Sequence, residues 1–184
     1  MRFHATLLLT AATMAFSAPL KAQAPPAGAV PAHIRQALPE ARLSGQGRFT
    51  WFGLTIYDAA LWVGAHGCRP GSPFVLDLRY ARSLNGQRIA KASIEQMQKA
   101  GVGSAPQHTQ WLINMQAVFP DVHEGTHLSA LFTPQAPTRF FLNGQPLGEI
   151  GDPEFGPAFA AIWLSPATSA PRLREALLQD AGAR

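Results

Sequence analysis

The amino-acid sequence predicts an α+β fold, in which a largely antiparallel β-sheet is backed by a layer of helices. Three observations support this prediction. Segments typical of strands form two groups separated by two helical segments, without the strand–helix alternation of a parallel sheet. Asn143-Gly144 is the best hairpin signal in the chain, because both residues tolerate positive φ. Hydrophobic residues make up 47% of the 184 residues and charged residues 14%, which is typical of a folded protein with a sizeable core.

Residues 1–24 have the features of a secretory signal peptide. Arg2 supplies the positive start, residues 5–18 are mostly apolar, and Ala22-Gln23-Ala24 offers a small-residue cleavage site. Pro25 would hinder cleavage there, so the position of the cut stays open. The apolar run is shorter than the roughly 20 residues that span a bilayer. We therefore expect an exported, periplasmic protein that does not span the membrane; a buried N-terminal helix is the alternative.

The cysteine count and the charge narrow the class of protein further. Cys68 is the one cysteine, so the mature domain has no internal disulfide and the leader has no site for lipid attachment. The formal net charge is +4, of which Arg2 and Lys21 in the expected leader contribute two. The remaining charge is too small, and the arginines too scattered, to predict a nucleic acid or an anionic membrane as partner.

The first half of the mature chain predicts strands. After a Pro- and Ala-rich linker at 25–32, residues 48–53 and 54–63 are rich in β-branched and aromatic side chains. Residues 64–73 are rich in Gly and Pro and predict a loop. In residues 74–80, two sets of side chains alternate, which is the period of a strand with one buried face. The apolar set is Phe74, Leu76, Leu78 and Tyr80, and the second set is Val75, Asp77 and Arg79.

Two helices are expected next. Ser83 and Asn85 are cap candidates for a helix that continues to about Ala100, and Pro106 suits the first turn of a second helix. The second helix has an apolar face that we interpret as core, formed by Trp111, Leu112, Met115, Val118 and Phe119.

The remaining chain predicts a second group of strands and a second pair of helices. Strands are expected at 126–132, 138–142 and 145–150. Asp152-Pro153-Glu154 combines a cap, a first-turn proline and an early acid, and so predicts the start of a helix. Ser169 is the candidate cap of a last helix.

Several stretches, taken in order, resemble a known family. They are Phe52 to Trp62, Leu78 to Arg82, Phe140 to Gly144, Gly148 to Ile150, Asp152 to Phe155 and Phe159 to Leu164. Their order and spacing resemble the chalcone isomerase-like family, in its bacterial exported branch. The resemblance implies an open-faced β-sandwich over residues 41–180, with a cleft between the sheet and the helices, preceded by a linker and N-terminal segment at 25–40.

The resemblance also implies where catalytic residues would lie. Plant chalcone isomerases hold the substrate's phenolate with an arginine, and use a threonine, a tyrosine, an asparagine and a second hydroxyl residue. The matching positions here are Phe52, Ile89, Gln96 and Ile162, so none of the hydroxyls is retained. An apolar side chain cannot stabilise an enolate. We therefore assign no catalytic residue and expect no cofactor.

Other members of the family bind fatty acids, and hold the carboxylate with an arginine and a tyrosine at the end of an apolar tunnel. Arg79 and Tyr57 are the candidate pair in this chain, with Tyr80 as a further ligand-binding residue. Arginine suits a carboxylate because it forms charge-assisted, bidentate hydrogen bonds. The alternative is that Arg79 is a solvated strand residue, paired with Asp77 or facing the outer surface.

One stretch matches a metal-binding pattern by letter. His123-Glu124-Gly125-Thr126-His127 fits the HExxH pattern of zinc peptidases, which needs both histidines on one face of a helix. Pro120 and Gly125 argue against a helix, and residues four apart on a strand lie roughly 13 Å from each other. His66 and Cys68 are too few ligands for a closed site. We therefore expect no metal site.

The sequence leaves two functional hypotheses of different class. The favoured one is a non-catalytic periplasmic protein that binds a fatty acid or another small amphipathic ligand between sheet and helices. The alternative is an intramolecular lyase or isomerase that uses other, non-standard residues of the same cleft, such as Tyr57, Tyr80 and Arg79. An envelope accessory protein has no feature for or against it, and a zinc hydrolase is the least favoured reading.

Overall fold

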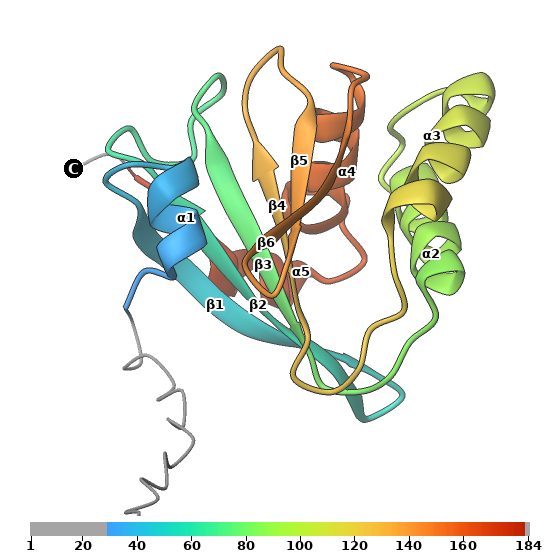
Figure 1. Ribbon diagram of the computed structural model, residues 1–184, viewed down its shortest axis with the longest axis horizontal. Helices are drawn as coiled ribbons and strands as arrows, with labels where there is room; N and C mark the ends of the chain where they lie inside the picture. Colours follow the sequence, from blue (N-terminus) through green and yellow to red (C-terminus); the bar gives the residue numbers. More distant parts are fainter. Residues whose placement is uncertain (1–28, 183–184) are drawn as a thin grey trace, which may run out of the picture.

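The computed structural model describes residues 29–182 (Figure 1). The signal peptide expected at 1–24 lies outside the described residues. Within them, the elements are α1 (Ala32–Ala37), β1 (Arg42–Trp51), β2 (Leu54–Val63), β3 (Phe74–Tyr80), α2 (Gly86–Lys99), α3 (Ala105–Val118), β4 (His127–Phe132), β5 (Thr138–Leu142), β6 (Gln145–Ile150), α4 (Phe155–Leu164) and α5 (Pro171–Leu177). No helix in this part of the chain has the length and apolar character needed to cross a bilayer.

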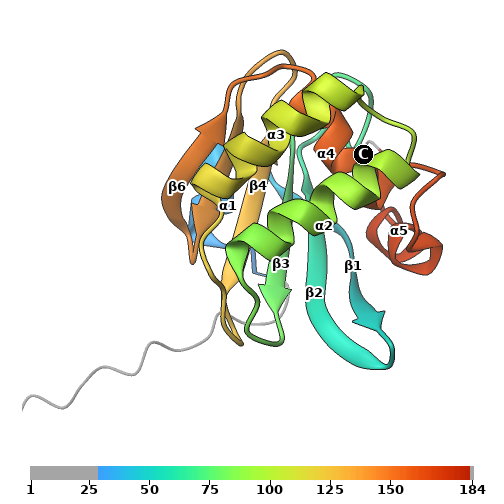
Figure 2. The same cartoon turned by 90° about the vertical axis from the view of Figure 1, so that its right-hand side faces the viewer.

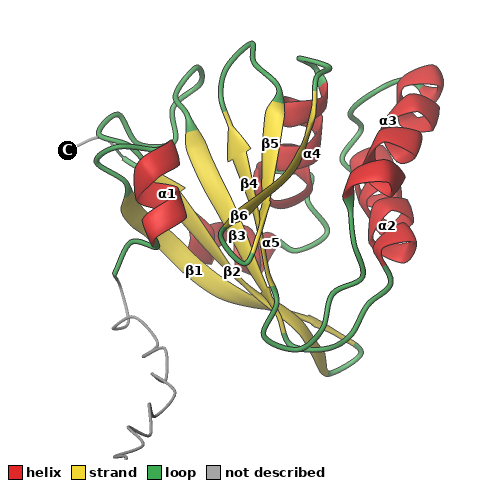
Figure 3. Cartoon of the chain, viewed as in Figure 1, coloured by secondary structure: helices red, strands yellow, loops and turns green. Residues whose placement is uncertain are grey.

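The strands form one six-stranded antiparallel sheet in the order β1-β2-β3-β4-β5-β6. Each strand pairs with its neighbour in the sequence, and the long connection through α2 and α3 joins the adjacent strands β3 and β4. Helices α2 to α5 cover one face of this sheet, while α1 lies on the other (Figures 1 and 3). The predicted α+β fold, with an antiparallel sheet backed by helices, is confirmed.

The side chains on the helical face of the sheet form the main hydrophobic core. On β3, Leu76, Leu78 and Tyr80 belong to this core, whereas Val75 packs on the opposite face with α1. Alternation along the strand therefore assigns each residue to one of two separate environments.

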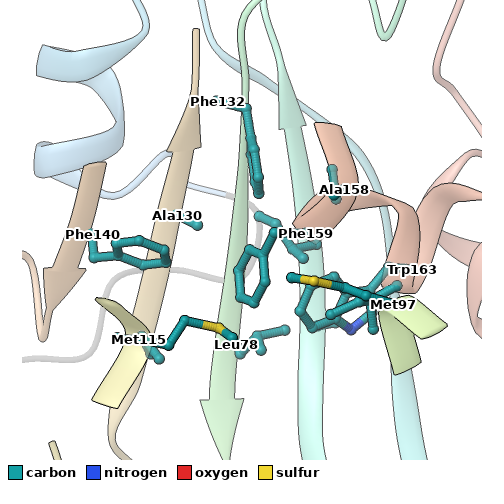
Figure 4. Close-up of a cluster of buried hydrophobic side chains, with 14 of the residues drawn as sticks. Leu78, Met97, Met115, Ala130, Phe132, Phe140, Ala158, Phe159 and Trp163 are labelled. Carbon is teal, nitrogen blue, oxygen red and sulfur yellow. The ribbon is translucent and has the colours of Figure 1, made fainter. Parts of the chain in front are cut away.

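An aromatic cluster joins α4 to the sheet (Figure 4). The rings of Phe155 and Phe159 are stacked with centroids 5.2 Å apart, and Phe159 also meets Phe140 at 5.8 Å. Met97 of α2 and Met115 of α3 are fully buried in the same cluster. Because these rings and thioethers fill the space between the layers, one end of the interlayer region is solidly packed.

Helix α1 was not predicted from the sequence. It buries Ile34 and Leu38 against Trp62, Val75 and Leu131 on the face of the sheet opposite to the other helices. A helix of six residues has too few turns to produce a periodic pattern, and its stability depends on this packing rather than on helix propensity. The expectation that the helices gather on one face therefore holds for α2 to α5 only.

The helix starts are partly as predicted. Asn85 caps α2 as expected, since its side chain accepts hydrogen bonds from the backbone N–H groups of residues 87 and 88. Helix α4 begins later than predicted, at Phe155, and Asp152 instead accepts from the backbone N–H of Glu154. The predicted cap at Ser169 is wrong: Ala170 precedes α5, and the Ser169 hydroxyl donates to Gln96 of α2.

We predict that Gly45→Ala lowers the free energy of unfolding by about 2 kcal/mol, because α5 lies directly on β1 at this point. A Cβ atom at Gly45 would stand 1.9 Å from the carbonyl oxygen of Ala176, a backbone atom that cannot move alone. Gly151→Ala is the matched control, since a Cβ there meets nothing within 4 Å, and it should change the free energy of unfolding by less than about 0.5 kcal/mol. Urea unfolding of both variants measures the difference, and equal midpoints would contradict the close approach.

Candidate functional site

A cavity of about 400 Å³ lies between the sheet and the helical layer. The helical face of β1, β2 and β3 forms its floor, α2 and α4 form its walls, and Ser169 and Ala170 before α5 also line it. Most of the lining is apolar, including Phe49, Leu78, Leu84, Ile89, Phe119, Leu128, Phe159 and Ile162. Its volume is within the range of about 300–1,000 Å³ that is usual for small-molecule sites.

Two tyrosines supply polar atoms on the cavity floor. Tyr57 of β2 and Tyr80 of β3 are paired across the two strands, with their rings edge to face and 6.0 Å apart. Trp163 of α4 donates a hydrogen bond from Nε1 to the Tyr57 hydroxyl, 3.0 Å away. This bond fixes the phenol against α4 and leaves the hydroxyl proton of Tyr57 free to be donated.

Burial keeps both phenols in the neutral form. Desolvation raises the pKa of Tyr57 far above its ordinary value and outweighs the opposing hydrogen bond from Trp163. Desolvation also raises the pKa of Tyr80, with a further contribution from the neighbouring Tyr57. Near neutral pH the cavity floor therefore presents two uncharged O–H groups, which can donate to a bound oxygen but cannot act as phenolate bases.

The charged groups of the cavity come from α2. Arg88, Glu95 and Lys99 line the cavity along this helix, and all three are exposed at its rim. Gln96 lies among them and accepts a hydrogen bond from the Ser169 hydroxyl, which ties α2 to the segment before α5. The lining thus changes from apolar at the floor to charged at the rim.

Arg79 does not line this cavity. It follows the alternation of β3, so its side chain lies on the face opposite to that of its neighbour Tyr80. Arg79 borders a separate, polar depression together with Asp58, Asp77 and His127. The expected pairing of Arg79 with Tyr57 around one ligand is therefore not formed, whereas Tyr57 and Tyr80 do meet. Of the three residues suggested for a lyase or isomerase, the cavity therefore brings together Tyr57 and Tyr80 but not Arg79.

The resemblance pointed to four family positions, and three of them lie at the cavity. Ile89, Gln96 and Ile162 are part of its lining. Phe52 instead occupies the turn between β1 and β2, where its side chain is exposed. The cavity thus corresponds in place to the cleft that the resemblance implied, but two of the three positions present aliphatic side chains.

A hydrogen-bonded network occupies the opposite face of the sheet. The buried carboxylate of Asp77 accepts from the Ser129 hydroxyl at 2.6 Å and from His127 Nδ1 at 2.8 Å. Because the Ser129 proton goes to Asp77, its oxygen accepts from Nε2 of His33 on α1, 3.0 Å away. These bonds connect α1 to β3 and β4, so the network stabilises the contact between α1 and the sheet. Ser129 is completely buried, which keeps its hydroxyl from acting on a substrate.

The HExxH stretch is not helical. Residues 123–126 form a turn, in which the Thr126 N–H donates to the carbonyl of His123 and Gly125 adopts a φ of 84°. His127 then begins β4 and binds Asp77. As predicted from the sequence, the two histidines therefore do not lie on one face of a helix. Across residues 29–182, no group of three or more His, Cys, Asp or Glu side chains is arranged to hold a metal ion.

Comparison with known proteins adds three findings. The family model described as chalcone isomerase-like matches residues 28–179. A protein of uncharacterised function from Haemophilus influenzae is 27% identical over 135 residues, which are 73% of this chain and 66% of that protein. The chain thus spans just under two thirds of the length of that relative. The crystal structure of a fatty-acid binding protein from Arabidopsis thaliana superposes with a TM-score of 0.64 at 12% identity, over 78% of this chain and 89% of that one.

We predict that His127 makes the stability of the protein depend on pH. Its hydrogen bond to Asp77 raises the pKa of His127 above 6.5, so protonated His127 favours the folded state. This contribution is complete below pH 6.5 and is lost as the pH rises through the raised pKa. The difference in melting temperature between the wild type and His127→Gln should therefore be largest at acidic pH and shrink toward pH 8.5, as measured by differential scanning fluorimetry.

The control is His66→Gln, in the exposed loop between β2 and β3. Burial lowers the pKa of His33, and the charge of His127 lowers it further, so the comparison is repeated in a His33→Gln background, where this contribution is absent. A wild-type advantage over His127→Gln that grows with pH would contradict the prediction.

Proposed function

The chain belongs to the chalcone isomerase-like family, and on this premise we propose that it is a non-catalytic periplasmic protein that binds a fatty acid or another small amphipathic molecule. The observation that carries the proposal is the cavity between sheet and helices, which has an apolar interior and charges only at its rim. The likeness in fold to a plant fatty-acid binding protein supports the same class of ligand.

The interior suits an alkyl chain. Burying a methylene group in an apolar site is favourable by about 0.8 kcal/mol, so the length of chain that the cavity accepts governs the affinity. The aliphatic side chains of Ile89 and Ile162 extend the apolar wall at positions where the enzymes of the family carry hydroxyls. The two phenols on the floor are neutral donors, which can bind an oxygen of the ligand but supply no charge for catalysis.

The head group is best placed at Arg88. A carboxylate at the rim stays partly hydrated while it forms a charge-assisted hydrogen bond with a guanidinium. Lys99 is the other cation of the lining, but Glu95 lies one helical turn from Lys99 and two turns from Arg88. The negative charge of Glu95 therefore opposes a carboxylate at Lys99 more strongly than one at Arg88.

We predict that Arg88→Ala weakens the binding of a fluorescent fatty acid by roughly 10-fold, the value expected for one hydrogen bond to a charged group. Lys99→Ala should have a smaller effect, because Glu95 offsets part of its charge. Arg79→Ala is the matched control and should leave the affinity unchanged, since Arg79 lies on the other face of the sheet. Titration of the purified protein with cis-parinaric acid and displacement by palmitate measure all three.

The proposal has two clear ways to fail. A protein purified from its own periplasm that releases no lipid on organic extraction, and that takes up no added fatty acid, would exclude the ligand class. An equal loss of affinity in Arg79→Ala and Arg88→Ala would move the head group away from the rim of the cavity. Release of the protein by osmotic shock, followed by sequencing of its N-terminus, tests export.

A further inference from the structure

The turn between β1 and β2 carries an unusual concentration of exposed apolar side chains. In residues 29–182, four large hydrophobic side chains are more than half exposed: Trp51 (54%), Phe52 (88%), Leu54 (51%) and Ile113 (56%). Three of them lie within four consecutive residues, which we call the hairpin tip (residues 51–54). The segment 49–57 that surrounds the tip contains no charged residue. Figure 2 shows the hairpin at the lower end of the sheet, away from α2 and α3.

The backbone conformation of the tip is unfavourable for Phe52. Trp51 and Leu54 are paired, so the loop is Phe52-Gly53, with φ values of 47° and 77°. Two-residue loops with positive φ at both positions favour Asn-Gly, and an aromatic residue at the first position is strained. Phe52 therefore gains nothing from the local backbone, and its exposed ring makes no core contact that would offset the strain.

The hairpin tip is continuous with the cavity. Trp51 lines the cavity and is also half exposed at the tip, where its ring meets that of Phe52 edge to face at 5.0 Å. An apolar path thus runs from the outer surface of the hairpin to the cavity floor at Phe49 and Tyr57, whose rings are stacked 5.1 Å apart.

We propose that the hairpin tip inserts into the surface of a lipid bilayer and so places the mouth of the cavity where an amphipathic ligand can pass between the membrane and the protein. The inference rests on the proposed function for its ligand class. Aromatic side chains favour the interface between head groups and acyl chains, and Trp, Phe and Leu are the apolar residues typical of peripheral membrane contacts. Because residues 49–57 contain no charged side chain, insertion of the tip does not require a charge to be desolvated.

The shape of the tip favours a lipid surface over a protein partner. Stable protein interfaces bury about 800 Å² on each side, which is more than the three exposed side chains of the hairpin tip can provide. A bilayer needs no complementary surface, because lipid tails adapt to a projecting wedge. The overall charge is small, so insertion is driven by apolar burial, and the binding should persist at high salt concentration.

The test compares Phe52→Asn with the wild type in sedimentation with vesicles of phosphatidylethanolamine and phosphatidylglycerol. The partition coefficient should fall roughly 10-fold or more in Phe52→Asn, because burial of one Phe ring is lost. Asn suits positive φ, so the melting temperature should stay equal or rise, which separates lost binding from lost folding. Ile113→Gln on α3 is the matched control and should bind as the wild type does.

Tryptophan fluorescence gives an independent readout. Trp62, Trp111 and Trp163 are buried, so a blue shift on addition of vesicles reports Trp51 and should vanish in Trp51→Phe. All variants share the same N-terminal residues, so any contribution of these residues to binding cancels in the comparison.

Three results would overturn the inference. One is a wild-type protein that binds palmitate in solution but does not sediment with vesicles, which leaves the proposed function intact. Another is an equal loss of vesicle binding in Phe52→Asn and Ile113→Gln. The third is self-association of the wild type that Phe52→Asn abolishes without any vesicle binding, which would make a second copy the occupant of the tip. A wild type that binds vesicles through the tip yet takes up no fatty acid would support the surface and refute the ligand class.

Discussion

The alternation of side chains across the antiparallel sheet is the constraint on which the rest of the structure depends. Because every strand turns successive residues to opposite faces, one sheet separates an apolar environment under α2 to α5 from a smaller one under α1. The consequence is sharpest on β3, where Tyr80 lines the cavity and the adjacent Arg79 borders a polar depression on the far side. A shift of one residue in the register of β3 would exchange the faces on which Tyr80 and Arg79 lie. The pairing of β3 with β2 and β4 therefore fixes the position of both residues.

The cavity exists because the two helices that border it pack differently. Helix α4 fills the space above the sheet with Phe155, Phe159 and Trp163, whereas the lining from α2 includes the small side chains of Ala92 and Ser93 beside its longer ones. Small side chains leave room that the large ones do not, and the hydrogen bond from Trp163 to Tyr57 holds α4 against the floor. The bond from Ser169 to Gln96 joins the end of α2 to the segment before α5. These two hydrogen bonds therefore connect the elements that border the cavity.

Much of this architecture could be predicted from the sequence, and the failures have identifiable causes. The spacing of apolar residues predicted most of the strands and helices, because long amphipathic elements repeat their pattern over several turns or pleats. Helix α1 was not predicted, because six residues are too few to show the 3.6-residue period of a helix. The structure does not bring Arg79 and Tyr57 together, and the sequence contained a signal for this: the alternation of residues 74–80 puts Arg79 with Val75 and Asp77, away from Tyr80. The exposed state of Phe52 depends on the exact two-residue loop, which the boundary between the predicted strands 48–53 and 54–63 suggested but did not define.

The apolar lining of the cavity and the position of the hairpin tip both bear on how an apolar ligand would enter and leave the protein. An apolar ligand that fits a dry cavity is held by its hydrophobic transfer energy, and that energy resists release into water. The interior of the cavity is largely aliphatic and aromatic, with two neutral phenols on its floor, so an apolar ligand would be held there mainly by burial. Exchange with a second apolar phase avoids the barrier, because the ligand then leaves the cavity without full exposure to water. One part of the mouth is apolar, because Trp51 borders the cavity and its ring meets that of Phe52, whereas Arg88, Glu95 and Lys99 form the charged part of the rim. An alkyl chain that passes along the apolar part avoids contact with these charges.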